Sequence, residues 1–231
     1  MPGTLALYCI HENTVAATMT YLVDMIRKPA LEQAAAQLYD SRLPYHNFSH
    51  ALEMLTSARE LVERCRDADI DIEVAIVYPA VLFHDAGYQE DHRRHGYDSK
   101  EAYSAALAVR ILHHYGYASV DIHAISSAIL STKCGVECGS IEARLVRTAD
   151  LSGLGTSYRL FIQNALRLWR EDVILNGREV SWESWRDQAV AILEQFLDED
   201  MGLSPDCYAP DGEAWLNKRG RENLERLRHE P

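Results

Sequence analysis

Histidines and aspartates stand at several places along the chain where a divalent metal could be bound. His46 and His50 lie in LPYHNFSHALEML at positions i and i+4, so both share one face if that segment is helical. His84 and Asp85 follow the apolar run VAIVYPAVLF, and Asp150 closes the amphipathic segment IEARLVRTADL. An ionised aspartate at the end of a buried helix is costly unless it is paired or binds a metal. Imidazole nitrogens and carboxylate oxygens from separate helices would form an octahedral or near-octahedral metal site with positions open to water.

These side chains need a frame of helices to bring them together, and the apolar spacing is helical almost throughout the chain. We therefore expect an all-α fold, a helical bundle with additional C-terminal helices. Pro79 lies inside the third predicted helix, which must either bend there or begin later than its apolar spacing indicates. The predicted helices are roughly Val15 to Tyr39, Phe48 to Arg66, Ile72 to His84, Lys100 to His114, Val120 to Ser131, Ile141 to Leu151, Tyr158 to Leu175, Trp182 to Leu197 and Glu213 to Arg228.

The composition suits a single domain that spans residues 1–231. Of these residues 47% are hydrophobic, which is sufficient for a sizeable core. The longest apolar stretch, Val74 to Phe83, is about half of what a bilayer-spanning helix needs, and the N-terminus lacks the features of a secretory signal. The five cysteines are scattered and odd in number, which is typical of reduced thiols. We expect a cytoplasmic protein without a membrane partner.

The net charge of −12 bears on the class of partner. Proteins that bind a nucleic-acid duplex gain much of their affinity from Lys and Arg side chains that neutralise phosphates, so this charge argues against such a partner. A small phosphorylated substrate needs only a metal and a few local cations. It therefore remains compatible with the acidic surface.

The candidate ligands resemble the metal site of the HD superfamily, which is named after its His-Asp pair and has the pattern H…HD…D. The stretches LYDSRLPYHNFSHALEML, FHDAGY, KEAYSA and STK…ADLSGLG are similar, in this order, to a bacterial family of predicted HD phosphohydrolases. The resemblance covers a metal-binding core of about residues 39–155, while residues 156–231 match only loosely. It implies a metal-dependent phosphohydrolase that cleaves a phosphate ester or anhydride of a nucleotide or another small phosphorylated metabolite. The metal ligands would be His50, His84, Asp85 and Asp150.

The resemblance also implies catalytic roles. The YHN…H element is similar to that of cyclic-nucleotide phosphodiesterases, in which the first histidine protonates the leaving oxygen, and this makes His46 the candidate general acid. KEAYSA resembles the NEERSA segment of the bacterial family, with Glu101 kept and the Asn absent, so Glu101 would position or deprotonate the attacking water. A cation must balance the phosphoryl charge. Lys133, which follows AISSAILST, is the preferred candidate, with Arg93 and Arg94 next; the alternative for Lys133 is a solvated lysine favoured by the helix dipole.

One metal ion is preferred over two. Many two-metal HD enzymes supply further histidines between the His-Asp pair and the last aspartate, where this chain has Lys133 and Cys134. The candidate ions are Mn²⁺, Mg²⁺, Co²⁺, Fe²⁺ and Zn²⁺. Two other functions stay open: an HD-type di-iron oxygenase, which needs about six ligands, and a catalytically silent module that binds a metal or a nucleotide.

Two further segments have alternative interpretations. The polar loop Gln89 to Asp98 follows the His-Asp pair and is interpreted as a surface loop, or else as a lid over the site. Trp182 and Trp185 open an amphipathic segment and are interpreted as core anchors or as a contact between two copies of the chain, which would make a homodimer.

Overall fold

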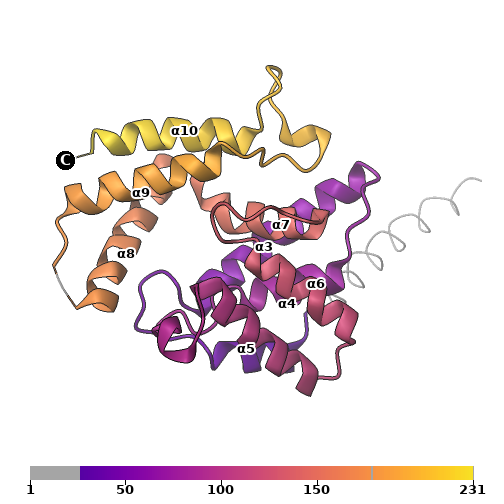
Figure 1. The fold of residues 1–231 in the computed structure, drawn as a ribbon. Coiled ribbons are helices and arrows are strands. Elements are labelled where there is room, and N and C mark those ends of the chain that lie inside the picture. Colours follow the sequence, from indigo (N-terminus) through magenta and orange to yellow (C-terminus); the bar gives the residue numbers. More distant parts are fainter. Residues whose placement is uncertain (1–26, 178, 231) are drawn as a thin grey trace, which may run out of the picture.

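The chain folds into helices and connecting loops. The computed structural model describes residues 27–177 and 179–230, and in these ranges it contains helices but no strand, which confirms the predicted all-α class (Figure 1). The α-helices are α2 (Pro29–Ala36), α3 (Phe48–Asp67), α4 (Val74–Phe83), α5 (Lys100–His114), α6 (Ser119–Leu130), α7 (Ile141–Asp150), α8 (Tyr158–Asn176), α9 (Trp182–Leu197) and α10 (Trp215–Arg228). Three short 3₁₀ turns are η1 (His92–His95), η2 (Leu151–Gly155) and η3 (Pro205–Cys207).

The predicted helix boundaries agree with these elements to within two residues, apart from the first helix. The part of the predicted first helix before residue 27 lies outside the described residues, and its described part ends at Ala36 rather than at Tyr39. Helix α4 begins at Val74 and runs through Pro79. The helix therefore accommodates the proline.

Side-chain caps fix the starts of the helices that carry the predicted site residues. The Asn47 side chain accepts a hydrogen bond from Ser49 N at 2.8 Å at the start of α3. Ser99 caps α5 through Ala102 N, and Ser140 caps α7 through Ala143 N, each at 3.2 Å. Each cap satisfies a backbone N–H that lacks a partner inside its helix, which is worth about 1 kcal/mol.

Two hydrophobic cores hold the helices together. The first core is formed by α2 to α7, with α4 at its centre; every residue of α4 from Ile76 to Phe83 is buried. A helix that is apolar all round is suited to such a central place. The second core is formed by η2, α8, α9 and α10, and its buried members are Leu151, Leu154, Phe161, Ala165, Val190, Phe196, Leu197, Met201, Leu224 and Leu227.

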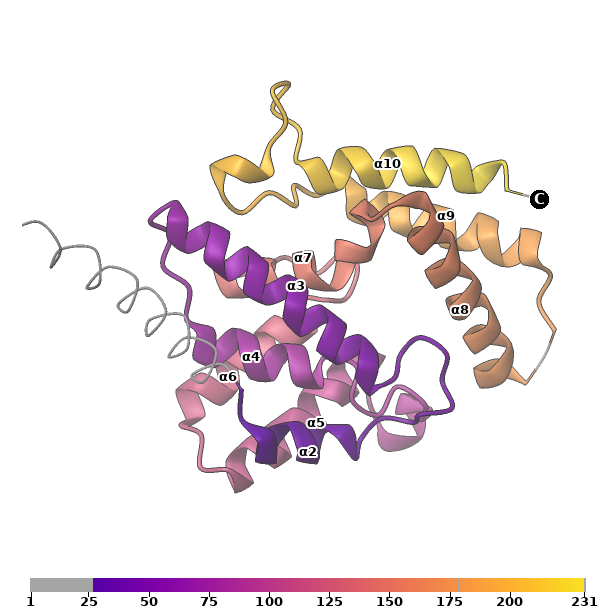
Figure 2. The same ribbon diagram turned by 180° about the vertical axis from the view of Figure 1, so that it is seen from behind.

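The C-terminal helices lie along one side of the first core. Helices α9 and α10 run side by side, and α8 extends from them back toward the first core (Figures 1 and 2). Asn223 ties α10 to the chain after α7, because its side-chain amide donates to the carbonyls of Leu154 at 2.8 Å and Thr156 at 2.9 Å. Buried Arg147 of α7 forms an ion pair with Glu199, beyond α9. The Arg147–Glu199 pair joins the two cores, while the Asn223 contacts hold α10 to η2 within the second core.

None of the helices within the described ranges combines the length and the apolar character needed to cross a membrane.

Candidate metal centre

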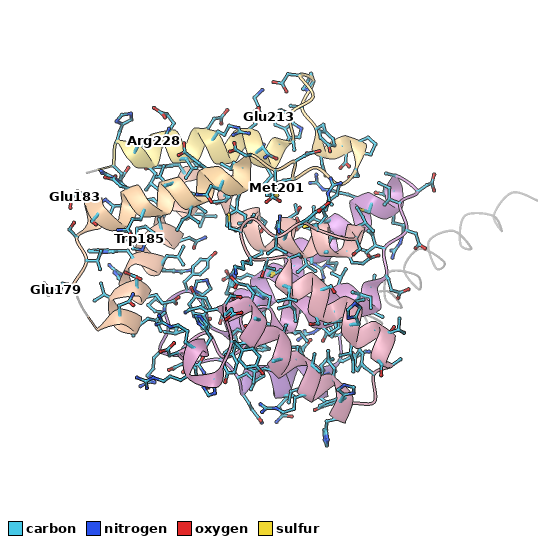
Figure 3. All side chains as sticks on the ribbon, viewed as in Figure 1. Glu179, Glu183, Trp185, Met201, Glu213 and Arg228 are labelled. Atoms are coloured by element: carbon cyan, nitrogen blue, oxygen red, sulfur yellow. The ribbon has the colours of Figure 1, made fainter. Side chains whose placement is uncertain are left out.

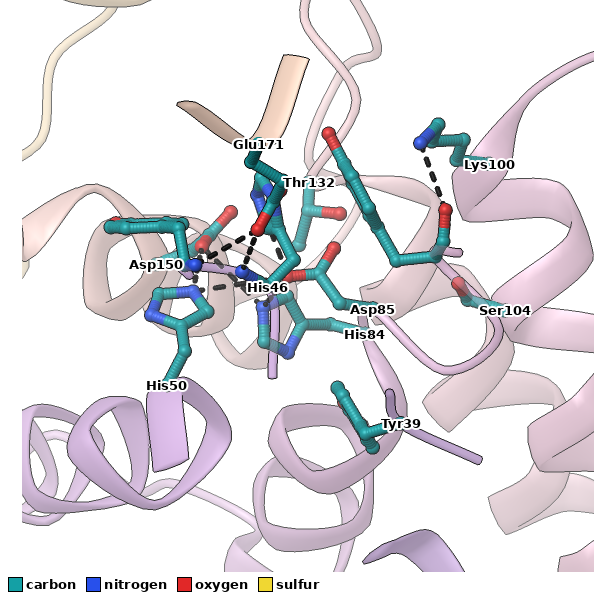
Figure 4. Close-up of polar contacts among 12 residues, drawn as sticks. Tyr39, His46, His50, His84, Asp85, Lys100, Ser104, Thr132, Asp150 and Glu171 are labelled. Carbon is teal, nitrogen blue, oxygen red and sulfur yellow. Dashed lines mark hydrogen bonds and ion pairs between the residues drawn. The ribbon is translucent and has the colours of Figure 1, made fainter. Parts of the chain in front are cut away.

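The predicted metal ligands converge at one point, although they come from three different helices or their ends (Figure 4). His50 lies in the first turn of α3, His84 and Asp85 follow α4, and Asp150 is the last residue of α7. The Nε2 atom of His84 lies 2.8 Å from Asp85 Oδ2 and 3.5 Å from Asp150 Oδ1. The Nε2 atom of His50 lies 3.8 Å and 3.4 Å from the same two oxygens. One ligand atom each from His50, His84 and Asp85 lies within 4.8 Å of the others.

The two imidazoles of the cluster are buried, and their Nε2 atoms lack hydrogen-bond partners. His50 is 8% and His84 is 1% exposed, and the Nε2 atom of each lacks a hydrogen-bond partner. Carboxylate oxygens lie near both atoms, at 2.8 Å from Nε2 of His84 and 3.4 Å from Nε2 of His50. A buried polar atom left unpaired costs about 1–3 kcal/mol. A divalent cation among the two nitrogens and the two carboxylates would satisfy all four groups, so these residues fit a metal.

A backbone contact orients His84 for this role. Its Nδ1 lies 2.8 Å from the carbonyl oxygen of Val81, which can only accept, so Nδ1–H donates there. Nε2 is then the atom directed at the carboxylates. Metal-binding histidines commonly use their second nitrogen in this way, which fixes the orientation of the ring.

The charges of the cluster favour ionised carboxylates. Burial opposes the charged form of Asp85, but His84 and His46 outweigh it and lower the pKa of Asp85. Burial likewise acts against ionised Asp150, yet contacts with His50 and His84 hold the pKa of Asp150 well below its usual range. Burial disfavours charged His84, while Asp85 and Asp150 raise the pKa of His84 well above its ordinary value. Both aspartates are therefore negatively charged and available to a cation near neutral pH.

His46 lies at the edge of the cluster and is held by a glutamate of α8. The Nδ1 atom of His46 contacts Glu171 Oε1, and Glu171 Oε2 accepts hydrogen bonds from the backbone N–H groups of Tyr45 at 2.9 Å and His46 at 2.8 Å. The Nε2 atom of His46 faces the cluster, 3.9 Å from Asp85 Oδ2. Burial raises the pKa of Glu171, but the contacts with His46 outweigh it and give a net lowering. Glu171 thus fixes the ring so that Nε2 is the atom offered to the site.

The sequence did not predict Glu171, which lies in the charged run Arg170-Glu171-Asp172. Only 1% of Glu171 is exposed. Phe161, Ala165 and Leu168 lie on one apolar face of α8 at positions i, i+4 and i+7. Glu171 follows at i+10 and therefore lies on the same face. A charged residue on an apolar helix face is the sequence feature that could have identified Glu171 as a site residue.

Tyr88 and Lys100 extend the cluster on the other side of His46. The Tyr88 ring stacks on His46 with centroids 3.7 Å apart and an interplanar angle of 18°. Lys100 Nζ lies 3.3 Å from the Tyr88 ring centroid and donates to the Tyr88 carbonyl at 3.0 Å. Burial lowers the pKa of Lys100, while Asp85 and Glu171 partly oppose that shift. Lys100, which the sequence did not single out as a cation, is a positive charge beside the cluster.

The other predicted catalytic residues are placed less directly. Glu101 lies in the first turn of α5, and its charge acts on Lys100 and Tyr88. Lys133 is exposed beyond the end of α6, and its carbonyl accepts from Arg147 Nη2 at 3.2 Å. Among the described contacts, neither side chain makes a hydrogen bond or ion pair with the four ligands. Their predicted roles stay predictions.

The other arginines and tryptophans of interest lie away from the ligands. Arg93 and Arg94 pair with Asp91 at 3.1 Å and 3.7 Å in the loop after the His-Asp pair, and both are exposed. Trp182 and Trp185 pack against the second core with ring centroids 5.6 Å apart, as the core-anchor interpretation expects.

Two cavities meet at the cluster. We call the larger one the α8–α9 cavity; its volume is about 470 Å³, and it is lined by His46, Tyr88 and Asp150 at one end and by side chains of α8 and α9 elsewhere. The smaller one, the α3–α8 cavity, has about 340 Å³ and is lined by His50, Asp150 and polar side chains of α3 and α8. The cluster is therefore reached from two sides.

A comparison of the sequence with protein-family models gives no match, and a comparison with curated proteins gives none either.

Proposed function

We propose that this protein is a metal-dependent phosphohydrolase of the HD type, in which water activated by one divalent ion cleaves a phosphate ester. The observation that carries this proposal is the pair of buried, unpartnered Nε2 atoms of His50 and His84 beside two ionised carboxylates. Such a cluster binds a cation, and the adjacent His46 adds a group that can transfer a proton. Metal binding and proton transfer together are what hydrolysis of a phosphate ester requires.

The four ligands would hold the ion and leave positions open for water and for a phosphoryl oxygen. A bound divalent ion would acidify a coordinated water and polarise the phosphoryl group. Nitrogen and oxygen donors of this kind suit Mn²⁺, Fe²⁺, Co²⁺ and Zn²⁺, and Mg²⁺ less well because of the two imidazoles.

His46 is the proposed general acid. Its Nδ1–H is held by Glu171, and its Nε2, directed at the cluster, carries the proton that the leaving oxygen receives. This pairing keeps one ring orientation. Glu171 is therefore a positioning residue.

Lys100 is the cation that the geometry supports best for the phosphoryl charge. It is close enough to Asp85 and Glu171 for their charges to act on it, whereas Lys133 is exposed. Glu101, the next residue along α5, lies beside Lys100 and Tyr88 on the His46 side of the cluster, so its predicted role in orienting the attacking water has no contact among the described residues to support it. Its carboxylate favours the charged form of Lys100 and partly opposes the lowering of the Lys100 pKa by burial.

A single ion is the proposal, because the group formed by His50, His84 and Asp85 is the one set of metal-binding side chains found in the described ranges. A di-iron oxygenase would need roughly twice as many ligands. The described residues do not offer them around this point.

The test compares two histidine variants. We expect His84→Ala to abolish both metal binding and hydrolysis of phosphate esters, since it removes a ligand. His123→Ala changes an exposed histidine of α6 and serves as the matched control, which should keep both properties. Metal content after purification and turnover in the presence of each candidate ion are measured side by side. Hydrolysis that survives the loss of His84 would overturn the proposal, as would two ions per chain.

A further inference from the structure

The α8–α9 cavity is built like a binding site for an apolar group. Its walls include Phe161, Leu168, Trp185, Ile192 and Phe196, and Trp185 lies on the side of α9 that faces α8 (Figure 3). A volume of about 470 Å³ is far larger than the voids that a packed core leaves, and it falls in the range of small-molecule sites. The second core is thus arranged around a space rather than filled.

The charges of this cavity disfavour a polyphosphate or a nucleotide. No lysine or arginine belongs to its lining among the described residues, and Asp172 adds a negative charge near the cluster. Its uncharged polar side chains away from the cluster are Asn164 and Gln188. A ribose and a base carry many donors and acceptors, which would lose water here without finding enough partners.

The position of His46 decides which part of the substrate enters this cavity. His46 lines the α8–α9 cavity, while His50 lines the α3–α8 cavity. In phosphoryl transfer the attacking and the leaving oxygens lie roughly in line on opposite sides of phosphorus. Because His46 is the group that protonates the leaving oxygen, the leaving alcohol lies on its side. The α3–α8 cavity, which contains Glu53, Gln163 and Arg167, is then the side that supplies water.

We propose that the substrate is a phosphate monoester of an apolar alcohol, whose hydrocarbon part occupies the α8–α9 cavity; this inference rests on the proposed function. Water forms a new bond to phosphorus while the ester P–O bond breaks. The proton on Nε2 of His46 goes to the leaving alkoxide, and a proton from the attacking water restores the histidine after release. The products are the free alcohol and inorganic phosphate.

Binding tests this inference without turnover. Alkylphosphonates, which cannot be hydrolysed at the P–C bond, are titrated into the metal-loaded protein while tryptophan fluorescence is followed. We expect octylphosphonate to bind at least about tenfold more tightly than ethylphosphonate, because each added methylene is removed from water. AMP should bind no better than ethylphosphonate. Equal affinities for the two phosphonates, or tighter binding of AMP, would overturn the inference.

Variants on α9 locate the effect. Ala189 lines the cavity, so Ala189→Trp should fill part of it and remove the preference for octylphosphonate. Ala191 is exposed on the same helix and does not line the cavity, so Ala191→Trp is the matched control and should keep the preference. Ile192 also lines the cavity, so Ile192→Asn should weaken the preference for octylphosphonate. Because Ile192 is 52% exposed, the fold should tolerate this substitution. If Ala189→Trp and Ile192→Asn both still bind octylphosphonate more tightly than ethylphosphonate, the assignment of the α8–α9 cavity to the hydrocarbon part is wrong.

Turnover then separates this inference from the proposed function. Faster hydrolysis of octyl phosphate than of ethyl phosphate and AMP supports both. Hydrolysis that is independent of chain length, or that is fastest with AMP, leaves the proposed function standing and overturns the apolar substrate. If no ester is hydrolysed but octylphosphonate binds with the expected preference, the proposed function fails, while the cavity still takes an apolar phosphorylated ligand.

Discussion

The two hydrophobic cores differ in how completely they are filled. In the first core, α4 has an unbroken buried run from Ile76 to Phe83, and the His-Asp pair follows it directly. In the second core, α9 buries only Val190, Phe196 and Leu197, and a cavity of about 470 Å³ remains between α8 and α9. The filled core fixes the positions of the candidate ligands. The open core leaves room beside them.

The cluster joins these two kinds of structure. All four proposed ligands come from the first core, whereas Glu171, which holds His46, comes from α8 of the second. Under the proposal, metal binding would therefore depend on the first core alone. The proposed proton transfer and substrate selection would depend on the second core as well, so metal binding and catalysis should be separable by mutation.

The difference in filling predicts unequal costs for removing a phenylalanine. Phe83 is 0% exposed in the first core, and Phe83→Ala should lower the free energy of unfolding by about 3–5 kcal/mol, because a cavity replaces the ring. Phe161 is 4% exposed but lines the existing cavity, so Phe161→Ala should cost only about 1–2 kcal/mol. Urea denaturation of both variants gives the comparison. Equal costs would mean that the second core is as closely packed as the first.

Glu171→Gln should separate proton transfer from metal binding. Without the carboxylate, His46 loses the contact that fixes its ring, so turnover of an alkyl phosphate should fall about a hundredfold. Turnover of p-nitrophenyl phosphate should fall much less, since its leaving group needs little protonation. Metal content should stay unchanged.

A purely structural role of Glu171 would reduce the turnover of both substrates alike, and that result would contradict its assignment as a positioning residue. Glu222→Gln, at an exposed position of α10, is the matched control and should leave both rates unaltered.

The sequence predicts the first core together with its cluster of candidate ligands, although the first predicted helix runs past Ala36, the end of α2. Apolar spacing places its helices, and the candidate ligands stand out because they directly follow or end apolar segments, as His84, Asp85 and Asp150 do. The functional features of the second core are harder to predict from the sequence. Glu171 is hidden in a charged run, and its partner His46 is 125 positions away in the chain. The α8–α9 cavity arises from how these two helices pack, and the spacing of apolar residues within each helix does not predict that packing.

The smallest expected effect concerns how strongly the two cores are coupled. Ser140 caps α7 in the first core and Ser181 caps α9 in the second, each through a 3.2 Å hydrogen bond, so Ser140→Ala and Ser181→Ala should each cost about 1 kcal/mol. All four tryptophans lie in α8, α9 and α10, so their fluorescence reports on the second core, while circular dichroism reports on every helix. Because Glu171 and the Arg147–Glu199 pair link the cores, we expect both variants to shift both signals equally. A Ser181→Ala shift seen by fluorescence alone would show that the open core unfolds independently of the filled one.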